Sequence, residues 1–206
     1  AVLGGVGAGK SSLLRVIAGA ESPRKGKVFW DDIDVTNNGG TLRFSVGYVA
    51  QDPVFPAQLL WKILGLDSAE ALTPDRQQTL ERLGVWPIIR RAPRGLEAKL
   101  GSADLSRNEA RLLCLAGLLF EDDSPVWVLD NPLEGLNGKA ARRCLQEIME
   151  KAQGRTLIVA LPRAIELDLF DRVLGMRRGK LMFDGEPAQW RERKAAPAGQ
   201  EASCRH

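Results

Sequence analysis

The sequence predicts an α/β protein whose mostly parallel, doubly wound sheet is flanked by helices. Strands that alternate with helical patterns along a chain favour a parallel sheet. A glycine-rich segment between the first strand and the first helix supports the same fold class. Five short apolar runs are typical of buried strands, namely 1–3, 27–30, 45–50, 126–130 and 156–161. Two further runs, 172–176 and 180–183, indicate a hairpin that turns at Arg178 and Gly179.

Helices are predicted between these strands, where apolar residues recur at spacings of three and four. The predicted helical segments are 9–19, 59–63, a segment starting at Thr73, about 107–120, and 138–152. Thr73 and Pro74 supply a cap and a first-turn proline. Gly154 ends the last helix. The tail after Trp190 is polar and has no apolar period, so residues 191–206 are predicted to be disordered.

Composition narrows the possible functions. The chain has 206 residues, 44% of them hydrophobic and 27% charged, which suits one globular domain with a substantial core. A net charge of +3 is too small to indicate nucleic-acid binding, and the sequence shows no strongly basic patch that would. No apolar run reaches the roughly 18–20 residues of a membrane span. The cysteines form no metal-binding pair, and the lone histidine, His206, leaves no core histidine for catalysis.

The segment LGGVGAGKSS, residues 3–12, carries the strongest functional signal. It has the spacing G-x-x-x-x-G-K-S directly after a strand and at the start of a helix. Glycines let backbone N–H groups approach phosphate oxygens, and the following helix adds its positive N-terminal end. The alternative is a glycine-rich turn with an incidental lysine. The predicted nucleotide-binding residues are Gly4, Gly5, Val6, Gly7, Ala8, Gly9, Lys10, Ser11 and Ser12.

Two of the predicted residues point to a magnesium nucleotide. Ser11 follows the lysine of the loop, where a hydroxyl is a typical Mg²⁺ ligand. Asp130 ends an apolar strand, the position from which P-loop NTPases hold the metal. We therefore expect Ser11 and Asp130 to serve the same ion.

The order of several further segments resembles the nucleotide-binding domain of ATP-binding-cassette (ABC) transporters. VGYVAQDPVF (46–55) resembles the Q-loop, with Gln51 as its glutamine, and EGLN (134–137) lies at the D-loop. DLSRNEARLLCLAGLLFEDDSPVWVLDNP (104–132) resembles the signature helix that leads into the Walker B strand. TLIVALPRAIELDLFDRVLGMRRGKLMFDGEP (156–187) is similar to the switch strand and final hairpin. PRGLEAKLG (93–101) is similar to the matching segment of exporter-type cassettes.

The resemblance covers about residues 1–190 and implies a P-loop NTPase with two subdomains. One is helical, at about 56–120, and the other is an antiparallel β subdomain truncated at the N-terminus. Because the chain starts without Met in the tail of a strand, we expect a fragment whose natural start lies upstream. The apolar stretch 56–64 lies where the family docks its membrane partner. An ordinary amphipathic core helix explains that stretch equally well.

The family also implies cofactors, partners and a location. ATP and Mg²⁺ would be held between two such domains, as a homodimer or a heterodimer, at the cytoplasmic face of a membrane. Transmembrane domains would belong to the same chain or to a partner, and no nucleic acid would be bound. Gln51 would join the nucleotide, metal and catalytic groups, so the metal set becomes Ser11, Gln51 and Asp130.

The chain departs from the family at three places. Asn131 stands where the family has the glutamate that activates water, and a general base typically contributes about 10²–10⁴-fold. Pro162 stands at the switch histidine and has no polar side chain. The signature positions are Leu105, Ser106, Arg107, Asn108 and Glu109, where two family glycines are replaced by Arg107 and Asn108.

These departures predict a domain that binds Mg-ATP but hydrolyses it weakly or not at all at its own site. The alternative is a non-hydrolytic, nucleotide-gated regulatory module. Hydrolysis through another base, such as Glu134, is a further alternative. Ser106 with Glu109 forms a helix capping box, either alone or with some phosphate contact. A GTPase is disfavoured because the guanine-reading string N-K-x-D is absent.

Overall fold

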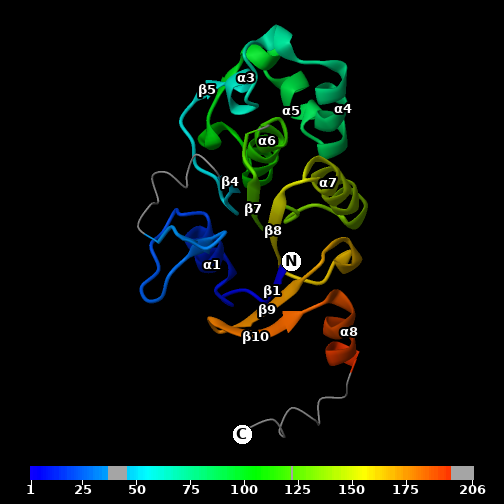
Figure 1. Ribbon diagram of the computed structural model, residues 1–206. Helices are drawn as coiled ribbons and strands as arrows, with labels where there is room; N and C mark the ends of the chain where they lie inside the picture. Colours follow the sequence, from blue (N-terminus) through cyan, green and yellow to red (C-terminus); the bar gives the residue numbers. More distant parts are fainter. Residues whose placement is uncertain (37–45, 122, 196–206) are drawn as a thin grey trace, which may run out of the picture. The chain divides into compact units, whose positions relative to one another are not determined.

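The computed structural model describes residues 1–36, 46–121 and 123–195. The chain divides into two compact units (Figure 1). The first unit combines Ala1–Lys10 with the chain from Leu161 onward, and the second is Ser11–Ala160.

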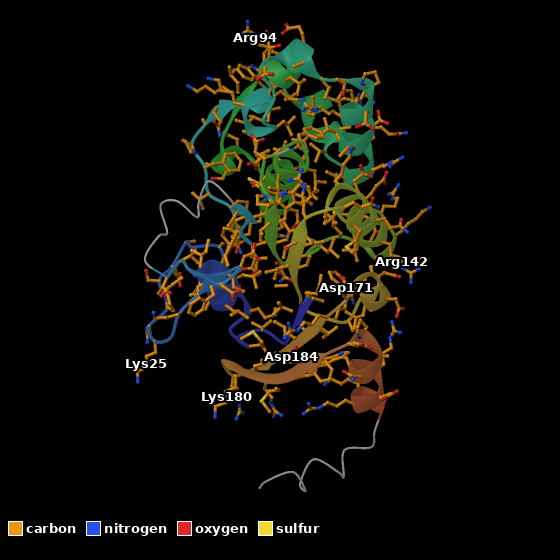
Figure 2. All side chains as sticks on the ribbon, viewed as in Figure 1. Lys25, Arg94, Arg142, Asp171, Lys180 and Asp184 are labelled. Atoms are coloured by element: carbon orange, nitrogen blue, oxygen red, sulfur yellow. The ribbon has the colours of Figure 1, made fainter. Side chains whose placement is uncertain are left out.

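The first unit contains a parallel strand pair and a hairpin. Strand β1 (Val2–Leu3) pairs in parallel with β9 (Val173–Arg177), and β10 (Lys180–Gly185) pairs antiparallel with β9. The hairpin turns at Arg178 and Gly179, whose φ angles of 50° and 74° match the turn type that suits the strand twist. The predicted hairpin is therefore confirmed. Asp184 on β10, labelled in Figure 2, receives two hydrogen bonds from Arg172, at 2.6 and 2.7 Å.

The first unit corrects the prediction of disorder for residues 191–195. Helix α8 runs Pro187–Ala195, so these residues are helical, while 196–206 lie outside the described residues. Pro187 pre-sets the first turn, and the following Arg, Glu and Lys residues are good helix formers. Trp190 also packs its ring edge against Phe183, with centroids 5.1 Å apart. Tertiary packing of one aromatic residue therefore orders a segment that has no apolar period. A 3₁₀ turn, η4 (Leu167–Leu169), completes the unit.

The second unit is built on the predicted parallel strands. Strands β4 (Val46–Val49), β7 (Val126–Asp130) and β8 (Thr156–Leu161) lie side by side in parallel. Val49 is opposite Leu129, and Asp130 is opposite Ala160. The carboxyl ends of these strands therefore meet at one edge of the sheet, which is where parallel α/β sheets place their ligand sites.

The helices of the second unit mostly follow the predicted ranges. They are α1 (Lys10–Ile17), α3 (Leu60–Ile63), α4 (Pro74–Leu83), α5 (Trp86–Arg91), α6 (Arg107–Leu119) and α7 (Gly138–Lys151). The Thr73 hydroxyl caps α4 by accepting from Arg76 N–H at 3.3 Å, as predicted. Two details differ from the prediction. Leu59 belongs to a strand rather than to a helix, and α5 has no predicted counterpart.

Short elements complete the second unit. Two antiparallel pairs form, β2 (Phe29–Trp30) with β3 (Ile33–Asp34) and β5 (Gln58–Leu59) with β6 (Lys99–Leu100). The 3₁₀ turns are η1 (Ala69–Ala71), η2 (Gly95–Glu97) and η3 (Ser102–Asp104). Helices α3, α4 and α5 gather at the end of this unit away from α1 (Figure 1), and α6 runs from them toward the sheet.

A buried polar contact joins α4 to α7. Glu147 on α7 is 3% exposed, and its carboxylate accepts from the Thr79 hydroxyl at 2.7 Å and from Arg82 at 3.0 Å. Buried carboxylates are costly unless they are paired in this way. Among the described residues, no helix combines the length and the apolar character that crossing a membrane requires.

Candidate functional site

The phosphate loop has the conformation that its glycines allow. Residues 4–9 connect β1 to α1, which begins at Lys10, and Gly7 and Gly9 have positive φ angles of 73° and 95°. The Lys10 ammonium donates to the carbonyl oxygens of Gly4 at 2.7 Å and Gly5 at 3.2 Å. The lysine therefore curls over the loop and places its positive charge against the loop backbone.

Two glycines of the loop are closely packed. A Cβ atom on Gly4 would lie 2.6 Å from the carbonyl oxygen of Met176, and one on Gly9 would lie 3.2 Å from Gly179 Cα. By contrast, a Cβ atom on Gly5 or Gly7 would meet nothing within 4 Å. The loop is thus closely packed against the β9–β10 hairpin at its two framing glycines and open at the glycines between them.

Asp130 and Asn131 lie at the carboxyl end of β7 in the second unit. Asp130 is 2% exposed, and its charge, together with burial as the larger cause, raises the pKa of Tyr48 on the adjacent strand β4. Asn131 has a left-handed φ of 57°, and its N–H donates to Ala160 O at 3.1 Å. This backbone conformation is uncommon outside glycine, and Asn is among the side chains that tolerate it.

The Asn131 side chain has an unsatisfied atom. Its Oδ1 is buried and accepts no hydrogen bond from any residue that the structure describes. A buried polar atom without a partner costs about 1–3 kcal/mol. A donor from outside the described chain, such as the hydrogen of a water, would satisfy this atom.

Gln51 lies two residues beyond the end of β4 and contacts the D-loop segment. Its Nε2 donates to Glu134 Oε2 at 2.8 Å. The sequence separation of the two residues is 83, so only the fold brings them together. The structure therefore joins Gln51 to the residue that the sequence offered as an alternative base.

Arg111, on helix α6, holds both of these segments. Its Nε donates to the backbone oxygen of Gln51 at 2.6 Å, and its Nη1 donates to the backbone oxygen of Glu134 at 2.9 Å. Its Nη2 lies 3.5 Å from Glu134 Oε2 and 3.8 Å from Asp52 Oδ1. The side chain is only 3% exposed. A buried arginine is rare unless it is paired, and here several oxygens converge on one guanidinium.

Sequence reasoning missed Arg111. The available signal was a charged side chain inside the apolar run of the signature helix. Arg111 stands four and seven residues before the buried Leu115 and Leu118, so the helical period places it on the buried side of α6. A charged residue at a buried position requires partners, although the sequence cannot say which ones.

The start of helix α6 carries the predicted capping box. The Ser106 hydroxyl accepts from Glu109 N–H at 3.3 Å, and the Glu109 carboxylate accepts from Ser106 N–H at 2.9 Å. Glu109 also pairs with Arg91 on α5. That ion pair is the largest cause that lowers the pKa of Glu109 to about 2, and the hydrogen bonds from Ser106 lower it further.

The two residues that replace the family glycines have different surroundings. The Arg107 side chain is 84% exposed, and its Nε lies 3.9 Å from Asp52 Oδ1. Asn108 instead turns toward its own D-loop segment, where Arg111 Nη1 donates to its Oδ1 at 3.3 Å. A Cβ atom on Gly135 would lie 2.6 Å from Asn108 Cγ. Of these two residues, Asn108 therefore packs within the chain and Arg107 faces outward.

The other predicted site residues are divided between the two units. Pro162 is exposed and directly follows β8. Ser11 and Ser12 lie in the first turn of α1. The phosphate loop belongs to the first unit up to Lys10, whereas Asp130, Asn131 and Gln51 belong to the second. A joint metal site of Ser11, Gln51 and Asp130 stays a prediction.

The donor atoms suit a hard divalent cation and a phosphate. A hydroxyl, a carboxylate and a carboxamide oxygen are the oxygen ligands that Mg²⁺ prefers, and it commonly uses only one or two carboxylates. In the part of the chain that the structure describes, His, Cys, Asp and Glu form no cluster of three or more that could hold a metal. The open glycines and Lys10 provide the backbone N–H groups and the charge that a phosphate requires.

Comparison with known proteins decides the family. A family model described as "ABC transporter" matches residues 1–134. The chain belongs to the ABC transporter family. Its fold agrees with this assignment. The structure of a bacterial Atm1-family ABC exporter with ATP bound matches 95% of this chain and 34% of that chain, with a TM-score of 0.77 and 24% identity. This likeness supports the fold alone.

Curated relatives of this ABC transporter domain carry transport names. The biotin transport ATP-binding protein BioM of Rhodobacter capsulatus is 32% identical over 197 residues, which cover 91% of this chain and 79% of the relative. The glutathione/L-cysteine transport system ATP-binding/permease protein CydC of Escherichia coli is 30% identical over 193 residues. That alignment covers 92% of this chain and 33% of CydC. The CydC protein of Haemophilus influenzae is 28% identical, with 33% of its length covered.

The length of these ABC transporter relatives shows how much of them the chain matches. The chain spans about a third of the length of the two CydC proteins. The family implies nucleotide binding, and the chain aligns over 79% of the length of a relative that is named as an ATP-binding protein. Its relatives include proteins named for both ATP-binding and permease parts.

Proposed function

We propose that this ABC transporter domain binds Mg-ATP at an interface with a second ATP-binding domain and hydrolyses it weakly or not at all at its own site. The observation that carries the proposal is the contrast between a complete phosphate loop and the residue beside Asp130. The loop has its glycines, its lysine and its serine, whereas the general-base position holds Asn131. Binding chemistry is thus present and proton-accepting chemistry is missing.

Asn131 can orient a water without activating it. Its Oδ1 is a hydrogen-bond acceptor that no described residue pairs, and an acceptor of this kind can orient a water in the nucleotide-bound state. A neutral carboxamide cannot take the proton of that water at neutral pH. Because a general base typically contributes about 10²–10⁴-fold, turnover at this site should be lower by that order.

The signature substitutions act on the other nucleotide of a pair. In the proposed arrangement, the signature segment of one domain faces the phosphate loop of its partner. The exposed Arg107 would then stand where a glycine allows close approach. If the chain pairs with itself, each of the two nucleotides would lie between a site without a general base and a signature segment without its two glycines. If it pairs with a better-equipped chain, this domain is the half that holds ATP without consuming it.

Magnesium would supply charge neutralisation for the phosphates when it is bound. Ser11, Gln51 and Asp130 are the residues proposed to hold it, and Lys10 is proposed to contact the phosphates. The transmembrane domains would belong to the same chain or to a partner, which would place this domain at the cytoplasmic face of a membrane. Transport in either direction is compatible with the relatives, although the segment 93–101 favours an exporter.

The second candidate function is a non-hydrolytic module that senses ATP and holds a partner. The exposed Pro162 favours it, because proline can neither donate to nor accept from a γ-phosphate through its side chain. Under this candidate, ATP binding would change partner affinity and no turnover would accompany it.

Steady-state ATP turnover tests the proposal. The wild-type chain and the double variant Asn131→Glu, Pro162→His are compared in the presence of Mg²⁺, alone and with a partner domain that has an intact site. The proposal predicts slow wild-type turnover and a clear gain in the double variant. Wild-type turnover equal to that of an intact ATPase domain would overturn it.

A further inference from the structure

We propose that Glu134 is a positioning residue whose carboxylate fixes which atom of the Gln51 carboxamide is offered to a divalent cation. The inference rests on the proposed function, in which Gln51 is one of the Mg²⁺ ligands. It adds a residue outside the predicted metal set and assigns it a role other than that of a substitute base.

The pairing chemistry allows only one orientation of Gln51. Its carboxamide presents two donors on Nε2 and an acceptor on Oε1, whereas an ionised carboxylate only accepts. The observed contact joins Gln51 Nε2 to Glu134 Oε2 at 2.8 Å. A flipped carboxamide would set two acceptor oxygens against each other. Glu134 therefore directs Oε1, the atom that can ligate a metal, away from itself.

Arg111 keeps the two partners within reach of each other. It donates to the backbone oxygen of Gln51 at 2.6 Å and to that of Glu134 at 2.9 Å. Its guanidinium is planar and rigid, so both chain segments are held at one spacing. The same group faces the Glu134 carboxylate at 3.5 Å. Arg111 thus links the two backbone segments that carry Gln51 and Glu134, so the side chains of these residues stay close together.

These contacts favour positioning over proton transfer. Oε2 of Glu134 is engaged by the Gln51 amide and also faces Arg111. Residues that orient metal ligands typically change metal affinity about 10–100-fold when they are removed. A substitute base would change turnover and leave metal binding unaltered. The two roles therefore have different readouts.

The variant Glu134→Gln tests the role while it preserves size. A glutamine can meet Gln51 with either its oxygen or its nitrogen, so the orientation of Gln51 is no longer unique. ATP binding to the full chain is measured by calorimetry across a range of Mg²⁺ concentrations and in EDTA. We expect the Mg²⁺ concentration for half-maximal ATP binding to rise about tenfold, with ATP affinity in EDTA unchanged.

A matched control lies on helix α4. Gln77 Nε2 donates to Glu81 Oε1 at 3.0 Å, which is the same pair of side chains on a surface that holds none of the predicted site residues. Glu81→Gln should leave the Mg²⁺ dependence at the wild-type value. Any general effect of replacing a carboxylate in a Gln–Glu pair would appear in both variants.

A double-mutant cycle separates action through Gln51 from other effects. In a Gln51→Ala background, Glu134→Gln should cause no further rise in the Mg²⁺ requirement. An equal rise in both backgrounds, or a wild-type Mg²⁺ requirement in Glu134→Gln, would overturn the positioning role while ATP binding stands. A wild-type chain that binds no ATP with or without Mg²⁺ would overturn both the proposed function and this inference.

Discussion

The carboxamide of Asn108 lies against Gly135, so that a Cβ atom at Gly135 would come within 2.6 Å of Asn108 Cγ. The contact ties the start of the signature helix to the D-loop segment of the same chain. Gly135 also has a φ of 77°, which an L-residue adopts at a cost of about 1–2 kcal/mol. The backbone conformation therefore favours glycine at this position, and a Cβ there would also push the Asn108 side chain aside.

Gly135→Ala should destabilise the chain by about 1–2 kcal/mol through backbone strain, and displacement of the Asn108 side chain from Arg111 adds to that loss. Gly84 is a matched control, since its φ is 80° and a Cβ there meets nothing within 4 Å. Urea unfolding should show a larger loss for Gly135→Ala than for Gly84→Ala. Asn108→Ala should remove the excess. Equal losses at the two glycines would show that Asn108 does not restrict Gly135.

The buried Glu147 should make the free energy of unfolding sensitive to Thr79. Thr79→Val removes the hydroxyl that donates to the carboxylate at 2.7 Å and leaves a buried acceptor short of a partner. The expected loss is about 1–3 kcal/mol by urea unfolding. The same substitution at Thr156, which is exposed on β8, should change the stability by less than about 0.5 kcal/mol. Similar losses at both threonines would contradict this account.

Glu109 should make stability fall in acid. Its folded-state pKa is about 2, below its ordinary value of 4.5, so its contribution is complete above 4.5 and disappears as the pH falls toward 2. Glu109→Gln retains a capping residue but loses the charge that pairs with Arg91. The stability difference between wild type and this variant, from urea midpoints, should shrink between pH 5 and pH 2. A difference that does not depend on pH would contradict the cause given for the lowered pKa.

Local sequence signals predicted much of the fold. The Thr73 cap, the Ser106–Glu109 capping box and the apolar strand that ends at Asp130 each depend on residues close together in the chain. Family resemblance supplied the position of Gln51. The prediction of disorder wrongly included residues 191–195 of helix α8. Trp190 anchors this helix by packing against Phe183, and periodicity cannot show such a contact.

The cluster around Arg111 could not be predicted from the sequence. Its contact with Gln51 spans 60 positions, and its contact with Glu134 spans 23. Long-range contacts of this kind leave no periodic or local signal. The sequence shows that Arg107 and Asn108 replace two family glycines. It does not show that Arg107 is exposed and that Asn108 packs against Gly135.

The central claim is that the glycine loop and Lys10 hold the triphosphate of a magnesium nucleotide, and ATP affinity tests it most directly. Calorimetry with Mg²⁺ should give clear binding to the wild-type chain, and Lys10→Ala should weaken it about tenfold or more, because a charge-assisted contact is lost. Lys25→Ala, at an exposed lysine labelled in Figure 2, should bind as the wild type does. Equal ATP affinity in the wild type and in a folded Lys10→Ala variant would contradict the account.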